Sequence, residues 1–482
     1  MPDTPLLIFL IVAHTLGVLC IFPALLYTRT PQGTMAWTLA LLMVPYIAVP
    51  FYLILGKRTF SGYEQARRKH NDLPTPWQEL TDSIIDGMRP YAISPTTSAE
   101  YTLDTLSNIV HMPVCGGNSC QLLIDAQEAF PEIYDAIKKA TSYILIEFYI
   151  IKNDAVGQEL KELLIKKAHE GVHIHILYDE LGSRKLPPGY IHSLRKEGVF
   201  IEPFNGKRHF LTNIWRLNFR NHRKMVIVDG TSAFIGGMNI GREYFGEGTL
   251  GYWRDTFIKV EGAAVQQAQI SFLEDWNWAV LKLPPNSMSY LRWRITPQEA
   301  NDTALVLPSG PADTIPAWRS AVVNLANQAT QRLWISTPYF VPDEGVLTAL
   351  QTAALRGVDV RILGPKKADH LLVQLSSFTL LRDLSTYGIQ VWAYKQGFLH
   401  QKAILVDDNL ACIGTANLDN RSLTLNFELS VLVNSREFCH DVEKMLNDDF
   451  GNSERMTIEK YTNKPLSFKI LCHIARLMAP IQ

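Results

Sequence analysis

The sequence predicts an α/β protein with two pseudo-symmetric mixed-sheet halves flanked by helices, preceded by a two-helix transmembrane hairpin. Three observations predict this fold. A motif of His, Lys and Asp occurs twice, at residues 222–229 and 400–407. The same alternation of strand and helix patterns precedes each copy. Two long apolar runs stand at the start of the chain.

The apolar runs cover residues 6–27 and 35–55, and each has the length of about 20 residues that crosses a bilayer core. A short polar turn with Pro and Gly joins them. A cleaved signal peptide is the alternative, but no basic residue precedes Leu6 and a second apolar run follows at once. We therefore expect a transmembrane hairpin over residues 1–56.

A basic cluster follows the second apolar run, and its members are Lys57, Arg58, Arg67, Arg68 and Lys69. The turn between the runs carries only Arg29. The positive-inside rule then predicts that the large domain faces the cytoplasm. The cluster could also rest on anionic lipid headgroups. Residues 57–117 are interpreted as a juxtamembrane linker with one helix near 77–88.

The rest of the chain contains an internal duplication. Strand, helix and strand patterns at 142–149, 157–170 and 171–177 are repeated at 333–339, 345–356 and 357–363. We assign the first repeat to residues 118–285 and the second to 286–482, with a Pro-rich boundary at 283–287. An amphipathic helix is expected near 468–478. It either lies on the membrane surface or docks against the domain core.

Each motif is predicted to be a β-hairpin. An apolar, β-branched strand follows the His and Lys, then a turn signal, then a return strand. Because side chains alternate along a strand, His222 and Lys224 share one face, as do His400 and Lys402. Asp229 and Asp407 fall at the turns with the opposite parity, which places them away from a reaction centre.

Two further residue pairs are duplicated around the motifs. Each return strand leads to a glycine-led turn that ends in Asn239 or Asn417, whose amides could donate to a bound anion. Downstream, Asp255 and Glu428 each enter a strand. We assign these two carboxylates to fixing the second nitrogen of each imidazole.

If the two hairpins meet, they form a phosphate receptor with a nucleophile on one side and an acid on the other. One histidine would attack phosphorus, and the other would protonate the leaving alkoxide and then deprotonate the incoming alcohol. The lysines and asparagines would offset charge on the phosphate oxygens. No cluster at metal-ligand spacing competes, so neither metal nor cofactor is expected. Symmetry alone does not choose the nucleophile.

Overall charge argues against a nucleic-acid partner. The 482 residues include 46 Lys and Arg against 47 Asp and Glu, a formal net charge of −1. Nucleic-acid-binding domains are usually basic. The charge balance therefore gives no support to a nucleic-acid partner.

From about residue 118 onward the paired motifs resemble the phospholipase D superfamily. The N-terminal hairpin, with Pro31, Trp37, Pro45 and Pro50, is similar to that of bacterial cardiolipin synthases. Residues 337–342 and 414–422, the latter leading to Glu428, carry the resemblance further. Thr415 stands where the superfamily commonly has Ser or Gly.

This resemblance implies a metal-independent phosphatidyltransferase. One phosphatidylglycerol would give its phosphatidyl group to a histidine and release glycerol, and a second would attack to form cardiolipin. The catalytic set carried over is His222, Lys224, Asp229, His400, Lys402 and Asp407, with His222 as nucleophile. Phosphatidylglycerol and anionic membrane lipids would be the partners. The expected location is the bacterial inner membrane, multi-pass, with the catalytic domain on the cytoplasmic side.

Other functions stay open at this point. A membrane-bound phospholipase D hydrolase would use the same residues with water as acceptor. A related phosphatidyltransferase, similar to phosphatidylserine synthase, would need a nucleotide-activated lipid. A nuclease or a non-catalytic scaffold fits less well, because the hairpin is present and no motif residue is missing. Pairing of two chains in the membrane is also left open.

Overall fold

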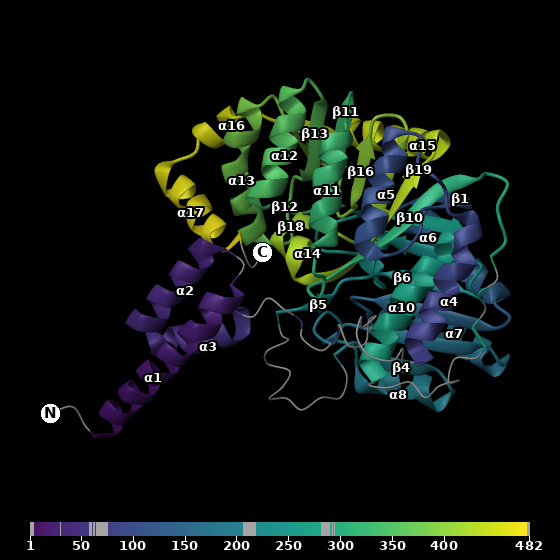
Figure 1. Ribbon diagram of the computed structural model, residues 1–482, viewed down its shortest axis with the longest axis horizontal. Helices are drawn as coiled ribbons and strands as arrows, with labels where there is room; N and C mark the ends of the chain where they lie inside the picture. The colour runs from purple at the N-terminus through teal and green to yellow at the C-terminus, as the bar shows by residue number, and fades with distance from the viewer. Residues whose placement is uncertain are drawn as a thin grey trace.

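The computed structural model describes residues 4–28, 30–56, 60, 63, 76–205, 218–280, 290–291, 293 and 295–479. The basic cluster after the second apolar run and the Pro-rich boundary at 283–287 lie outside the described residues. A large α/β body carries three N-terminal helices that project from one side (Figure 1).

The N-terminal helices are α1 (Thr4–Tyr27), α2 (Pro31–Met43) and α3 (Pro45–Leu55). Within the part of the chain that the structure describes, α1 alone is long and apolar enough to cross a membrane. The predicted second span is wrong as a continuous helix, because it breaks at Val44 (φ −139°, ψ 56°). Pro45 lacks an N–H and excludes the α conformation from the residue before it, so the helix stops and restarts.

The linker contains α4 (Pro76–Met88), which confirms the helix expected there, the short helix η1 (Arg89–Tyr91) and α5 (Ser98–Val110). A capping box begins α5, because the Thr97 side chain accepts from the Glu100 N–H while Glu100 reaches back to the Thr97 N–H. The boundary drawn at residue 118 falls inside β1 (Cys115–Ile124), and the domain boundaries remain predictions.

The first half is a mixed sheet with helices on both faces. Its strands lie in the order β1-β9-β7-β6-β2-β3-β4. The elements after β1 are α6 (Asp125–Lys139), β2 (Tyr143–Phe148), α7 (Ala155–His169), β3 (His173–Tyr178), α8 (Pro188–Lys196), β4 (Phe200–Pro203), β6 (Met225–Val228), β7 (Ser232–Gly236), η3 (Arg242–Phe245), β9 (Thr256–Glu261) and α10 (Ala264–Val280).

The second half repeats this arrangement strand for strand, in the order β10-β19-β17-β16-β11-β13-β14, with β20 added at the edge. Its elements are β10 (Asp302–Ser309), α11 (Ala317–Gln328), β11 (Arg332–Ser336), α12 (Glu344–Leu355), β13 (Asp359–Pro365), α13 (Leu371–Thr386), β14 (Gln390–Tyr394), β16 (Ala403–Val406), β17 (Leu410–Gly414), α14 (Asn420–Thr424), β19 (Asn426–Asn434), α15 (Arg436–Gly451), β20 (Ser453–Met456), α16 (Glu459–Thr462) and α17 (Leu466–Leu477). The matched order confirms the predicted duplication.

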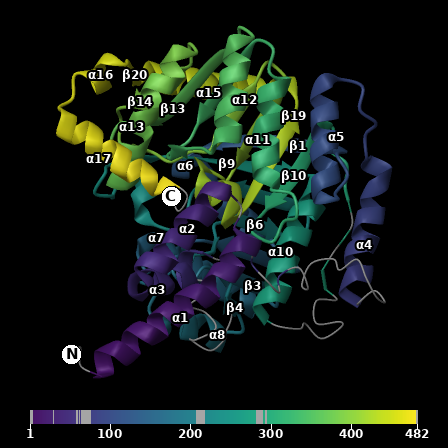
Figure 2. The ribbon, with the colours of Figure 1, turned by 60° about the vertical axis from the view of Figure 1, so that its left-hand side comes forward.

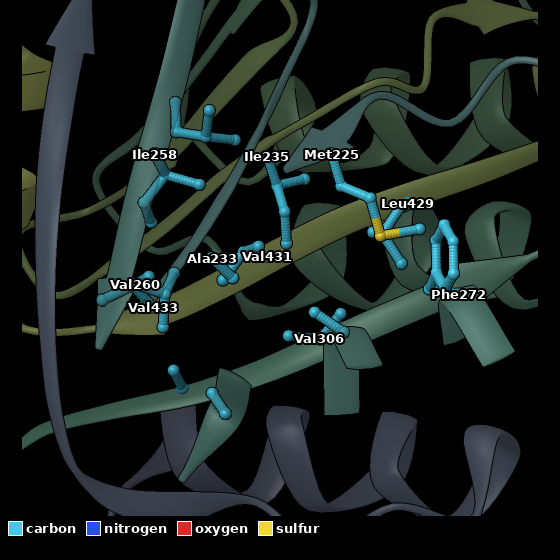
Figure 3. Packing of buried hydrophobic residues seen from close by; sticks show 14 of the residues in the cluster. Met225, Ala233, Ile235, Ile258, Val260, Phe272, Val306, Leu429, Val431 and Val433 are labelled. Atoms are coloured by element: carbon cyan, nitrogen blue, oxygen red, sulfur yellow. The ribbon is translucent and has the colours of Figure 1, made fainter. Parts of the chain in front are cut away.

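The two halves share one sheet and one core. β1 pairs antiparallel with β10, which joins the halves into a sheet of 16 strands. Met225, Ile235 and Ile258 of the first half pack in the same buried cluster as Leu429 and Val431 of the second (Figure 3). The strands of the two halves therefore pack face to face at a seam between the halves.

Candidate active site

Both motifs begin hairpins at this seam, as predicted. β6 pairs antiparallel with β7, and β16 pairs antiparallel with β17. His222 and Lys224 directly precede β6, while His400 and Lys402 directly precede β16. All four side chains are buried.

Short strands from opposite halves set the register of the two histidines. β5 (Arg220–Asn221) pairs with the start of β19, so that Asn221 lies opposite Phe427. β15 (Phe398–Leu399) pairs with β8 (Trp253–Arg254), so that Leu399 lies opposite Arg254. In the first pair the next residues are His222 and Glu428. In the second pair they are His400 and Asp255. This register brings each histidine beside a carboxylate of the other half.

The histidine–carboxylate contacts follow from that register. His222 Nδ1 lies 2.9 Å from Glu428 Oε2, and His400 Nδ1 lies 2.6 Å from Asp255 Oδ2. Since a carboxylate only accepts, each Nδ1 donates and each Nε2 is the nitrogen left for chemistry. The structure therefore brings together the four residues that the sequence singled out, in pairs that cross the two halves.

The two lysines donate to the backbone of the histidines. Lys224 Nζ donates to the His222 carbonyl at 2.6 Å, and Lys402 Nζ donates to the His400 carbonyl. Burial lowers the pKa of Lys224 to about 7 and that of Lys402 to about 8, against the opposing pull of Asp255 and Glu428. A bound phosphodiester anion would favour the charged form of both.

Burial lowers the pKa values of both histidines. Burial lowers the pKa of His222 to about 4, although Glu428 opposes the shift. The pKa of His400 also falls well below its ordinary value, through burial and then through Lys402 and Lys224. Each histidine responds to the lysine of the other half, because the two motifs occupy one small volume.

The two carboxylates differ in their surroundings. Glu428 accepts from Thr415 Oγ1 at 2.6 Å and from Ser422 Oγ at 2.7 Å, besides His222. Burial alone would raise the pKa of Glu428, but His222, Lys224 and Thr415 bring it below its usual value. Burial raises the pKa of Asp255 to about 6, despite Lys402 and the Thr256 amide.

One position contributes to this difference. Gly237 and Thr415 occupy equivalent places after the return strands. A Cβ at Gly237 would lie 2.1 Å from Asp255 Oδ1, so no hydroxyl can be offered there. At Thr415 the hydroxyl is present and donates to Glu428. The departure from the family pattern noted at Thr415 thus has a hydrogen-bonding role.

The asparagines flank the histidines but are used differently. Asn239 Oδ1 accepts from the Ile150 N–H at 3.0 Å, and its Nδ2 donates to the Tyr244 hydroxyl at 3.2 Å. Asn417 Nδ2 lies 3.4 Å from Asp419 Oδ2, while its buried Oδ1 has no hydrogen-bond partner among the described residues. Their role as substrate ligands stays a prediction.

Three tyrosines near the site escaped the sequence reasoning. Tyr244 OH lies 3.5 Å from His400 Nδ1, and the Tyr149 ring centroid lies 5.0 Å from that of His222. Tyr339 donates to Asp369 Oδ2 at 2.7 Å. A signal existed for two of them, because Tyr149 and Tyr339 end matched segments of the duplication.

Asp229 and Asp407 accept hydrogen bonds from backbone amides. Asp229 accepts from the backbone N–H groups of Thr141, Ser142 and Tyr143 at 2.7–2.8 Å. Asp407 accepts from the equivalent amides of Thr330, Gln331 and Arg332. Both sit in the left-handed region, at φ 51° and 50°. Their catalytic role stays a prediction, and these amide contacts agree with the strand-parity argument, which placed both residues away from the reaction centre.

Comparison with known proteins now adds the family. A family model described as "Cardiolipin synthase, PLD-like domain" matches residues 133–276 and 322–450, and one described as "Phospholipase_D-nuclease N-terminal" matches residues 15–57. Cardiolipin synthase A of Pseudomonas putida (strain W619) is 40% identical over 477 residues, which cover 97% of this chain and 96% of the relative.

The chain belongs to the cardiolipin synthase family.

Cardiolipin synthase A of Pseudomonas syringae pv. syringae (strain B728a) is similarly related, at 41% identity over 97% of this chain and 96% of the relative. The two matched ranges of the family model each contain one His and Lys motif. Among solved structures, phosphatidylserine synthase of Haemophilus influenzae Rd KW20 superposes with a TM-score of 0.61 at 16% identity, covering 80% of this chain and 100% of that one. That likeness supports the α/β fold.

Proposed function

We propose that the chain is a cardiolipin synthase that transfers a phosphatidyl group from one phosphatidylglycerol to another and releases glycerol. The observation that carries this proposal is the pair of histidines, each held by a carboxylate of the opposite half. The full-length relationship to proteins named cardiolipin synthase A supports it. The surroundings of each carboxylate indicate the role of the histidine that it contacts.

In the first step, Nε2 of His222 attacks phosphorus and the bond to the glycerol oxygen breaks. Glu428 accepts from Nδ1 and is kept ionised by its hydroxyl donors, which offsets the positive charge that forms on the imidazole. The glycerol oxygen takes a proton from Nε2 of His400, which enters this step as the imidazolium because the phosphodiester anion beside it favours the charged form. The His400–Asp255 pair suits this role, because Asp255 holds a proton more readily than Glu428 does.

In the second step, a hydroxyl of another phosphatidylglycerol gives its proton to His400 and attacks phosphorus. The phosphorus–nitrogen bond breaks, cardiolipin leaves and His222 returns to its neutral state. One phosphodiester replaces another across the two steps, so no nucleotide is consumed. Lys224, Lys402, Asn239 and Asn417 are proposed to stabilise the phosphate oxygens throughout.

Membrane anchoring is proposed to involve all three N-terminal helices. α2 and α3 both pack on α1, and Gly17 faces the break between them, since a Cβ there would lie 2.4 Å from the Leu41 carbonyl. Most side chains of α1 are exposed and apolar, as lipid contact requires. We propose that α2 and α3 together form the second, broken arm of a hairpin.

A bacterial inner-membrane location with the catalytic domain on the cytoplasmic side rests on the basic cluster after residue 56. Single cysteines introduced in the turn at 28–34 and after residue 56 would test it by labelling in intact cells. Labelling of the turn alone by an impermeant reagent is expected. Cross-linking of the same variants would show whether two chains pair.

Product analysis tests the function. Purified protein on phosphatidylglycerol vesicles, with chelator and without nucleotide, should yield cardiolipin and free glycerol. Phosphatidic acid alone would instead mean a phospholipase D hydrolase. Product only after addition of a nucleotide-activated lipid would mean a phosphatidyltransferase of the phosphatidylserine synthase kind. His222→Ala and His400→Ala should each lose turnover by about 10³-fold or more, with exposed His440→Ala as the matched control.

A further inference from the structure

A cavity of about 720 Å³ lies in the second half, outside the catalytic seam. It opens between α13, the ends of β13 and β14, and the segment that joins α16 to α17. Its inner wall is apolar and is formed by Phe340, Ile362, Phe378, Leu381, Leu384 and Val391. The volume falls within the range of about 300–1,000 Å³ that is typical of ligand sites.

The cavity adjoins the catalytic site through two loops. Pro338 and Ala368 line the cavity, and the residues that follow them, Tyr339 and Asp369, hydrogen-bond to each other. Asp369 in turn acts electrostatically on His400 and Lys402. The cavity wall is therefore linked to the catalytic histidine and lysine through the hydrogen bond between Tyr339 and Asp369.

The charges at the cavity rim are of both signs. Lys366 Nζ and Lys460 Nζ both lie near Glu454 Oε1, at 3.3 Å and 3.0 Å. Glu454 compensates half of the charge of these two lysines, and Glu459 and Lys464 add one further charge of each sign. The interior offers hydrocarbon contacts instead, which suits an alkyl chain rather than a phosphate.

The surface beside the cavity is apolar and exposed. α17 packs on α13 through Cys472 and Ala475, so the core-docking interpretation holds for its inner side. Its outer side exposes Leu466, Ile470, Leu471, Ile474, Leu477 and Met478. Both ribbon views place the C-terminal end of α17 beside α2 of the membrane helices (Figures 1 and 2). The exposed apolar side of α17 is thus continuous with the part of the molecule that enters the bilayer.

We propose that this cavity holds an acyl chain of the phosphatidyl group bound at the catalytic site, taken from the bilayer past α17. The proposal rests on the proposed function, because it names where the lipid substrate places its hydrocarbon. A chain that enters the cavity leaves its headgroup at the β12 (Phe340–Val341) end, close to Asn417, where the Leu418 N–H donates to Thr337 Oγ1 at 3.2 Å.

Gly364 gives the sharpest test. It lines the cavity, and a Cβ built there meets only the Thr337 carbonyl, at 3.5 Å. Alanine therefore fits, while the ring of Gly364→Phe would occupy the cavity. The measured quantity is the ratio of kcat/KM for long-chain phosphatidylglycerol to that for a dihexanoyl analogue. Relative to Gly364→Ala, Gly364→Phe should lower this ratio by about tenfold or more, the effect of excluding two buried methylenes. Gly189→Phe, on an open surface of α8, should leave the ratio unchanged.

Binding without turnover separates this proposal from the proposed function. In His222→Ala, phosphatidylglycerol carrying a bromine-labelled acyl chain should quench fluorescence of Trp392, which lines the cavity. The quenched fraction should fall in His222→Ala combined with Trp392→Phe. Equal ratios for Gly364→Phe and Gly364→Ala, or quenching that is insensitive to Trp392→Phe, would overturn the acyl site. Absence of cardiolipin from the unmodified protein, with quenching intact, would overturn the function and leave the acyl site standing.

Discussion

At the scale of single residues, each histidine contacts one carboxylate, but the two carboxylates differ in the hydrogen bonds that they receive. Glu428 receives two side-chain hydroxyl hydrogen bonds, whereas the carboxylate of Asp255 is approached by the backbone of Gly237. A buried carboxylate that accepts several hydrogen bonds stays ionised and supports a nucleophile, while one that accepts fewer holds a proton more readily. The difference between Thr415 and Gly237 therefore bears on which histidine attacks phosphorus.

Thr415→Val should shift the pH dependence of turnover. Loss of the hydroxyl removes a donor to the ionised form of Glu428, so the pKa of Glu428 rises. Activity that needs ionised Glu428 is present above this pKa and lost as the pH falls through it. The acidic limb of the kcat profile should then move to higher pH, and Thr415→Ser should restore it. An unchanged acidic limb in Thr415→Val would show that the hydroxyl does not position Glu428.

Asp229 should act on stability rather than on chemistry. Asp229→Ala leaves three backbone N–H groups without their acceptor and should cost about 1–3 kcal/mol of unfolding free energy. Chemical unfolding followed by circular dichroism measures this loss. Turnover per folded molecule should remain far above that of His222→Ala. A variant of normal stability with turnover as low as His222→Ala would place Asp229 in the catalytic set.

At the scale of elements, the features that the sequence predicted correctly are those that occur in both halves. The hairpins, the strand–helix–strand units and the carboxylates at 255 and 428 all appear where the duplication placed them. Residues without a repeated pattern were missed, such as Tyr244. The exchange of carboxylates between halves was also not predicted, because it depends on β5–β19 and β8–β15 pairing across the seam. The break at Val44 follows from Pro45, whereas hydropathy does not detect it because the residues on both sides are apolar.

α17 should matter only where the substrate is in a bilayer. Ile474→Glu with Leu477→Glu places charge on the exposed apolar side and should reduce activity on vesicles by about tenfold, since each charge is costly at a lipid interface. Activity on the dihexanoyl analogue should fall by much less. Leu355→Glu, at an equally exposed leucine on α12, is the matched control. Equal losses on both substrates would mean that α17 supports only the fold.

At the scale of the whole molecule, the active site exists only where the two halves meet. The β1–β10 pair joins their sheets, and their strands pack in one buried cluster. The guanidinium of Arg223, fully buried, forms an ion pair with Asp275 and also donates to the Glu428 carbonyl at 3.1 Å and the Ser309 carbonyl at 3.4 Å. Arg223 thus links the first motif to the strands that carry the partner carboxylate.

Arg223→Met should therefore destabilise the whole protein. Removing the cation leaves the buried Asp275 carboxylate without this ion pair, which typically costs about 3–5 kcal/mol. The midpoint of chemical unfolding should fall, and the two halves should still unfold in one transition because they share a core. A variant that unfolds in two separate steps would show that the halves are independent. Arg89→Met, which removes an exposed ion pair, is the control.

The central claim is that the two halves build one site in which His222 carries the phosphatidyl group. The most direct measurement is peptide mass mapping of protein that is quenched with denaturant during turnover of phosphatidylglycerol. We predict a phosphatidyl adduct on the peptide that contains His222, and none on that peptide in His222→Ala. An adduct on the His400 peptide would contradict the assignment of roles. Absence of any adduct during active turnover would contradict the covalent mechanism.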